Sequence, residues 1–149
     1  MRNRAMRLSA ALLASCAVLF IRGVARAQYG NAETTIATMT CDNVESPGRV
    51  RCEVEASVEP GASITWGDVI LVQTPAFVSA LRGRIGPHDA TLRESGRWRW
   101  ALALVARKKG TGVVEGRVRM VVCRQPASGG AAICEPREVP IMGRVVVGE

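Results

Sequence analysis

The sequence is poor in aromatic side chains and contains a single histidine. Phe, Trp and Tyr together account for 4% of its 149 residues. Such a chain has few rings on which nucleic-acid bases could stack, and one histidine gives little material for a histidine-rich metal site. We therefore expect no nucleic-acid partner, no metal and no cofactor. The apolar content of 48% and the charged content of 22% are those of a globular chain, and the length fits one ordinary domain.

Long apolar runs are also scarce, since only residues 8–21 form one. This run is about 14 residues long, shorter than the roughly 20 residues that span a membrane. A basic start (Arg2, Arg4 and Arg7) precedes it, and the small-x-small sequence Ala25-Arg26-Ala27 follows it. These features predict a signal peptide over residues 1–27, followed by a mature chain, residues 28–149, without a membrane span.

The signal peptide also contains a sequence that resembles a bacterial lipobox. Leu13-Ala14-Ser15-Cys16 would make Cys16 a lipidated N-terminus. The apolar run continues beyond this cysteine, where a lipoprotein would usually turn polar, so we favour ordinary cleavage. The style of the signal and the arginine-rich, lysine-poor usage predict export to the periplasm of a Gram-negative bacterium. A lipid-anchored or a secreted protein is the alternative.

Most of the positive charge belongs to this targeting segment. Its five arginines leave 15 basic and 13 acidic residues in the mature chain, a net charge of +2 against +7 for the whole. This removes the main argument for a nucleic-acid partner. Residues 28–81 hold 7 acids and 2 bases, whereas residues 82–124 hold 11 bases and 3 acids. Pairing of acidic with basic strands explains this asymmetry most simply, and an anionic partner for the basic segment is the alternative.

Four cysteines remain after export, an even number that predicts disulfides. They are Cys41, Cys52, Cys123 and Cys134. Of the three connectivities, the spacing selects the two local pairs, Cys41–Cys52 and Cys123–Cys134. A zinc site is the alternative, but zinc sites usually contain close Cys-x-x-Cys pairs, and the sequence has none.

The sequence of the mature chain predicts a series of short strands separated by turns. In residues 49–59, charged or polar side chains alternate with Val50, Cys52, Val54, Ala56 and Val58, the period of a half-buried strand. The other predicted strands cover residues 34–41, 64–73, 77–85, 97–104, 113–123 and 139–147. Turns are expected at Ser46-Pro47-Gly48, Pro60-Gly61 and Gly86-Pro87-His88-Asp89, and a hairpin loop at residues 108–112. The pattern predicts an all-β fold, a single antiparallel immunoglobulin-like β-sandwich of about seven strands with two local disulfides.

The alternation places the two cysteine pairs in different environments. Cys52 shares the apolar face of its strand, and Cys41 shares a face with Met39, so this pair is expected to be a buried structural disulfide. Cys123 instead shares parity with Arg117 and Arg119, which directs it outward unless a bulge intervenes.

Cys134 follows a flexible loop at residues 125–130. An exposed disulfide beside basic side chains (Arg119 and Arg124) favours a thiolate and accessible exchange. The pair is either a redox centre or a second structural staple.

The segment Val118-Arg119-Met120-Val121-Val122-Cys123, together with Cys134-Glu135-Pro136-Arg137-Glu138-Val139-Pro140, resembles a known family. It is similar to the immunoglobulin-like periplasmic N-terminal domain of DsbD-type protein-disulfide reductases. In that family a strand ends in a cysteine, and a loop leads to a second cysteine before a last strand near a Val-Pro. The resemblance implies that Cys123 and Cys134 are the catalytic pair and that the partners are periplasmic thiol–disulfide proteins. The alternative is a non-catalytic interaction module with purely structural disulfides.

Three further features have simpler structural interpretations. His88 and Asp89 are adjacent, so they cannot easily form the hydrogen bond of a hydrolytic triad, and turn chemistry explains both. Trp98 and Trp100 lie on the apolar parity and are expected in the core. Trp66 precedes a turn-like Gly67-Asp68 step and is expected to be partly exposed.

Overall fold

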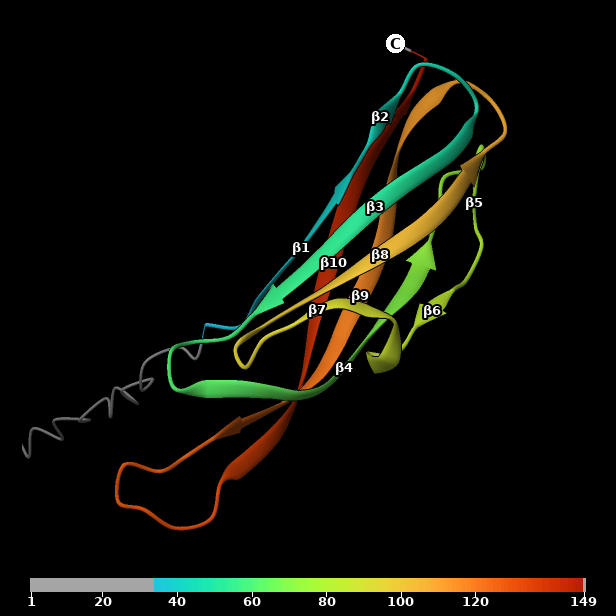
Figure 1. Cartoon of the computed structure of the whole chain (residues 1–149). Helices are drawn as coiled ribbons and strands as arrows, with labels where there is room; N and C mark the ends of the chain where they lie inside the picture. Colours follow the sequence, from blue (N-terminus) through green and yellow to red (C-terminus); the bar gives the residue numbers. More distant parts are fainter. Residues whose placement is uncertain (1–33, 149) are drawn as a thin grey trace, which may run out of the picture. The chain divides into compact units, whose positions relative to one another are not determined.

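The computed structural model describes residues 34–148, which form two facing β-sheets (Figure 1). The first sheet has the order β1 (Ile36–Cys41), β3 (Gly48–Ser57), β8 (Arg97–Ala106), β5 (Val78–Ala80), with β7 (Ala90–Arg93) also paired to β8. The second has the order β2 (Asn43–Val44), β10 (Ile133–Val147), β9 (Gly110–Arg124), β4 (Ala62–Gln73), β6 (Arg84–Ile85). This arrangement confirms the immunoglobulin-like sandwich. The pairings are antiparallel except for that of β2 with β10, which is parallel.

The predicted signal peptide and Cys16 lie outside the described residues. Within residues 34–148, none of the helical structure is long and apolar enough to cross a bilayer.

The core is built from the strand faces that the alternation predicts. Val50, Cys52, Val54 and Ala56 of β3 are fully buried, and their neighbours along the strand point to solvent. Trp98 and Trp100 of β8 are buried with ring centroids 5.8 Å apart. The Trp100 indole N–H donates to the backbone oxygen of Gly86 (3.3 Å), the partner that a buried indole needs. In antibody domains a buried tryptophan packs against a disulfide that joins the two sheets, whereas each disulfide of this chain joins two strands of the same sheet.

The predicted strand 77–85 is wrong in detail, because the chain changes sheets within it. β5 pairs with β8 in the first sheet, whereas β6 pairs with β4 in the second. Val78 and Ile85 are both buried, but the intervening residues 81–84 are exposed. Leu81 still bonds to β8 through Ala103, and Gly83 accepts a bond from Leu71 of β4.

The hairpin predicted at residues 108–112 is wrong, because β8 and β9 lie in different sheets and the chain crosses between the sheets here. The connection is also shorter than expected, since β9 begins at Gly110. Gly112 belongs to the strand and lies under Pro75, where an added Cβ would be 2.6 Å from the ring. Glycine is therefore required at position 112 by close packing rather than by a turn. The last strand is also longer than predicted, since β10 begins at Ile133. The Gly86–Asp89 turn forms a single 3₁₀ turn at Pro87–Asp89.

The turn-like Gly67-Asp68 step lies inside β4, within the strand predicted over residues 64–73. A register shift between Ile64 and Trp66 marks a bulge at which β4 has one more residue than β9. After the bulge, Gly67 faces inward against the Trp100 ring, where a Cβ would be 3.2 Å from a ring carbon. Asp68 and Trp66 consequently face outward, and Trp66 is partly exposed as predicted.

One edge of β10 has few partners among the described residues. β2 pairs only with Val146 and Val147, although β10 is 15 residues long. The backbone N–H of Gly148 donates to Val44 on this side, so even-numbered residues of β10 direct their backbone groups to this edge. Pro136 and Pro140 both occupy such positions. Each removes an edge donor without breaking a bond to β9.

Candidate functional site

Both predicted disulfides are present, and each joins directly opposed residues of neighbouring strands. Cys41 of β1 lies opposite Cys52 of β3, and Cys134 of β10 lies opposite Cys123 of β9. The sulfur atoms are 1.96 Å and 2.05 Å apart, respectively. The local connectivity predicted from the spacing is therefore confirmed.

The two bridges differ in exposure as the strand parity predicts. Cys52 is completely buried in the core, and Cys41 is partly buried against it. Cys123 is half-buried on the outer face of the second sheet, and Cys134 is exposed. The second bridge therefore contains the more exposed cysteine, Cys134.

The surroundings of Cys123 come mainly from β4, which pairs with the other side of β9. The Ser63 hydroxyl donates to the Cys123 carbonyl (3.3 Å), and the Thr65 hydroxyl donates to the Val121 carbonyl (3.3 Å). The same Thr65 oxygen lies 3.5 Å from the Cys123 sulfur. Cys123 is thus held between two strands, while Cys134 belongs to the outer strand.

The arginines predicted to lie beside this disulfide are bound elsewhere. Arg119 donates to the Asp68 carboxylate at 3.0 and 2.6 Å, and its guanidinium lies 5.9 Å from the centre of the Trp66 ring. Arg124 points to the opposite face of the hairpin and pairs with Glu59. The electropositive environment expected around Cys123 is therefore largely neutralised by carboxylates.

Asp68 carries a buried charge on this outer face of the second sheet, and it was not predicted from the sequence. Its side chain is 0% exposed beneath the guanidinium groups of Arg84 (2.6 Å) and Arg119. Burial alone would raise the pKa of the Asp68 carboxyl, but the hydrogen bonds and charges of the two arginines outweigh it and lower that pKa below its ordinary value of 3.8. The same hydrogen bond raises the pKa of Arg119. A carboxylate within the apolar run 64–73 was the signal that could have revealed this cluster.

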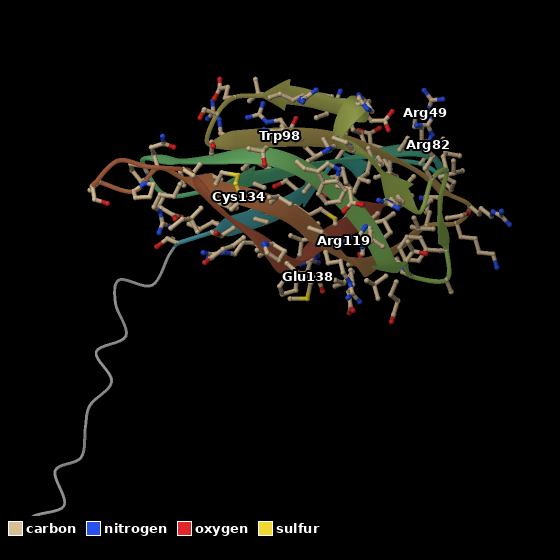
Figure 2. All side chains as sticks on the ribbon, turned by 90° about the horizontal axis from the view of Figure 1, so that it is seen from below. Arg49, Arg82, Trp98, Arg119, Cys134 and Glu138 are labelled. Atoms are coloured by element: carbon tan, nitrogen blue, oxygen red, sulfur yellow. A yellow bond between two sulfur atoms is a disulfide. The ribbon has the colours of Figure 1, made fainter. Side chains whose placement is uncertain are left out.

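The charged row continues across the sheet to β10. Glu138 lies opposite Arg119 in the strand register and accepts a hydrogen bond from Arg117 (2.8 Å). Figure 2 shows Arg119 and Glu138 on the same face. The row therefore consists of alternating charges that neutralise one another, and it ties β6, β4, β9 and β10 together.

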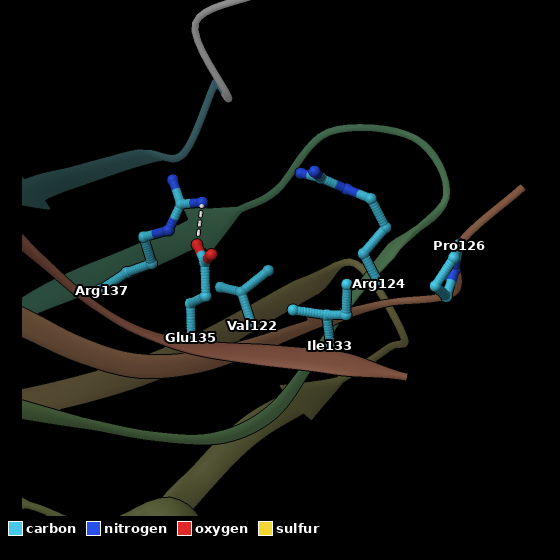
Figure 3. Close-up of a pocket in the computed structure, with 6 residues that line it drawn as sticks. All are labelled: Val122, Arg124, Pro126, Ile133, Glu135 and Arg137. Carbon is cyan, nitrogen blue, oxygen red and sulfur yellow. Dashed lines mark hydrogen bonds and ion pairs between the residues drawn. The ribbon is translucent and has the colours of Figure 1, made fainter. Parts of the chain in front are cut away.

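The opposite face of the hairpin contains a small pocket of about 150 Å³ (Figure 3). Its lining residues are Val122, Arg124, Pro126, Ile133, Glu135 and Arg137. Ile133 is 60% exposed, and Arg137 donates to Glu135 at 3.0 Å. Because Val122 and Glu135 are the pair next to Cys123 and Cys134, the pocket and the disulfide open on opposite faces.

The other residues considered in the sequence have structural partners. Asp89 accepts hydrogen bonds from Arg82 (3.2 Å) and from the Gly86 N–H (3.3 Å), so its carboxylate caps the 3₁₀ turn and does not bond to His88. In the part of the chain from residue 34 to 148, no three His, Cys, Asp or Glu side chains gather into a group that could hold a metal ion.

No protein-family model matches the chain, and no curated protein matches it. Three solved β-domains are similar at low identity. The ASH/PapD-like domain 7 of human CEP192 is 10% identical over 97% of this chain and 100% of that one, with a TM-score of 0.33. The seventh ScaB type I cohesin from Pseudobacteroides cellulosolvens is 15% identical over 74% and 91%, with a TM-score of 0.33. AggA, the major subunit of aggregative adherence fimbriae type I from Escherichia coli, is 11% identical over 78% and 97%, with a TM-score of 0.26. Similarities this distant carry no argument about function.

Proposed function

We propose that this chain is an exported, non-catalytic interaction module and that both of its disulfides are structural. The observation that carries the proposal is the position of each bridge. Each joins two residues that strand register already places opposite each other, so each acts as a staple across a pair of antiparallel strands. Two such bridges in one small domain fit an oxidising compartment, and we assign the periplasm on the strength of the predicted signal.

The chemistry around Cys123 supports the same assignment. The thiolate of a reactive cysteine is stabilised by a nearby cation, a helix N-terminus, a metal or the second cysteine of a Cys-x-x-Cys motif. Arg119 instead forms an ion pair with Asp68, and Arg124 forms one with Glu59 on the other face. The neighbour of the Cys123 sulfur is the neutral hydroxyl of Thr65.

Thiol–disulfide exchange, as the DsbD-like resemblance implies, is the second candidate, and the exposure of Cys134 favours it. In that reaction a partner thiolate would attack one sulfur of Cys123–Cys134, breaking that bond and releasing the other cysteine as a thiolate. A second partner thiol would then attack the mixed disulfide. The partner would leave oxidised, and this chain would hold two thiols after accepting two electrons.

The reduction potential of Cys123–Cys134 separates the two candidates. The mature protein is equilibrated in glutathione and dithiothreitol buffers, alkylated and read by mass spectrometry, with Cys41–Cys52 as the internal reference. We expect both bridges to have potentials below about −300 mV, the range of structural disulfides. A value between about −120 and −270 mV for Cys123–Cys134 alone would overturn the proposal.

A trapping experiment in cells tests the same point without a redox buffer. Cys134→Ala leaves Cys123 as a single thiol, and Cys52→Ala leaves Cys41 as a matched control. An exchange module would accumulate mixed disulfides with periplasmic proteins through Cys123 only. We expect no adduct that distinguishes the two variants on non-reducing gels.

A further inference from the structure

Most basic side chains of the described domain are neutralised by a neighbour. Between residues 34 and 148, all but five of them have a carboxylate within 4.0 Å or, for Arg93, the ring of Trp98 at 4.7 Å. The five without such a neighbour are Arg49, Arg107, Lys108, Lys109 and Arg144. Their positive charge is therefore directed to solvent.

These five residues, which we call the cationic end, lie toward one end of the sandwich. Gly48 is opposite Ala106 and Gly110 is opposite Val147, so Arg49, the turn 107–109 and the end of β10 converge there. The Lys109 side chain packs against Gly148, and Arg144 precedes this point on β10. Figure 1 shows the β2–β3 and β8–β9 connections at the same end, opposite the hairpin that carries Cys123 and Cys134.

Among residues 34–148, the acidic side chains near this end form no ion pair with these five cations. Asp42 and Glu45, in the β1–β3 segment, are exposed, and neither pairs with any of the five cations. Three of the cations are consecutive, so their fields add. The chain's two lysines are both among them.

The position of these cations indicates the kind of partner. Residues 107–109 connect β8 of the first sheet to β9 of the second sheet, at this end of the sandwich. Cations at a protruding tip can approach an extended negative plane together. Lysine ammonium groups on flexible stems act as point charges and need no fixed geometry of the acceptor. A bilayer surface with many anionic phosphate headgroups satisfies both conditions.

We propose that the cationic end docks this domain on membrane surfaces rich in anionic phospholipid headgroups. The inference rests on the proposed function, in which the chain acts by binding, and it names the binding surface and its partner. The hairpin lies at the other end, so docking leaves the face around Cys123 and Cys134 accessible.

Vesicle co-sedimentation of the mature protein tests this inference. The probes are vesicles of phosphatidylglycerol mixed with phosphatidylcholine, and vesicles of phosphatidylcholine alone, at low and at physiological salt. We expect binding to the anionic vesicles only, and weaker binding as salt screens the charges. R107Q/K108Q/K109Q should reduce affinity by about a hundredfold, since each basic residue near such a surface contributes about a fivefold change.

A charge-matched variant controls for net charge. R97Q/R117Q/R137Q also removes three positive charges, but from residues whose carboxylate partners lie at 2.8–3.0 Å. It should bind anionic vesicles at least tenfold more tightly than the tip variant. Equal losses in the two variants, or no binding of the unmodified protein, would overturn the inference, as would binding to polyglutamate-like acidic polymers without binding to vesicles.

Both disulfides are closed in these experiments, so the vesicle result does not depend on the potential of Cys123–Cys134. A structural potential with no vesicle binding leaves the interaction module and rejects the membrane partner. An exchanging potential with vesicle binding rejects the non-catalytic role and keeps the docking surface.

Discussion

The two disulfides form a natural matched pair for measuring what each bridge contributes. Both close a sequence separation of 11 residues. The entropy that each removes from the unfolded chain is therefore the same, about 2.8 kcal/mol at 25 °C. Any difference between the two deletions must arise in the folded state.

The structure predicts that difference. Cys52 is completely buried, and its bridge holds β1, whose strand partner in the first sheet is β3. Cys123 lies on the outer face in a strand that β4 pairs on the other side. C41A/C52A should therefore lose the chain-entropy contribution plus about 1 kcal/mol for the atoms missing from the core. C123A/C134A should lose about 2–3 kcal/mol, because solvent replaces the exposed sulfur.

Urea unfolding of the mature protein and the two double variants checks these values. Alanine is used because a serine hydroxyl at position 52 would be buried without a partner. A domain of this size has about 5–15 kcal/mol of stability, so both variants should still fold. The slope of the free energy against urea should rise equally in both variants, since both unfolded chains gain the same freedom.

Two results would refute this reasoning. A loss below about 1 kcal/mol for C123A/C134A would mean that the hairpin contributes little to the cooperative fold, and the bridge would then need a role other than stability. A larger loss for C123A/C134A than for C41A/C52A would mean that the buried environment of Cys52 does not decide the difference.

Three further changes test other parts of the structure. Asp68→Asn should lower stability at pH 7 by about 2–4 kcal/mol. The free energy of unfolding of this variant should also fall less steeply as the pH is lowered. In the unmodified protein the pKa of Asp68 is lowered, so the stability that its carboxylate contributes is lost as the pH falls through that pKa. Pro136→Thr/Pro140→Thr restores two donors on the β10 edge and should produce concentration-dependent association in sedimentation velocity, whereas the unmodified protein should show none. Gly116→Ala places a Cβ 2.8 Å from the Ile70 carbonyl oxygen and should lower the thermal midpoint by at least about 5 °C. Gly83→Ala faces open space, so a similar fall there would contradict the packing argument.

The sequence was sufficient for features that depend on strand alternation. Period-two patterns identified the buried faces of β3 and β8, and the spacing of the cysteines identified both bridges. Parity also gave the outward direction of Cys123. These features are local, since each depends on residues within one strand or one hairpin.

Features that depend on contacts between distant segments were not predictable in this way. The chain crosses between sheets near Leu81 because β8 and β4 each accept a short strand there, and neither contact is encoded locally. The glycine at position 112 resembled a loop residue, but it is required by the approach of Pro75. The unpaired cations became visible only once the partners of the other arginines were known.

The bulge at Thr65 links these errors to the question of function. Ile64 faces inward, so an uninterrupted strand would also direct Asp68 inward. The extra residue reverses the parity, and Asp68 lies opposite Arg119 on the outer face. Arg119 therefore has a buried carboxylate to neutralise, and its charge is not available to the sulfur of Cys123. One inserted residue in β4 therefore decides which face Asp68 occupies and which carboxylate neutralises Arg119.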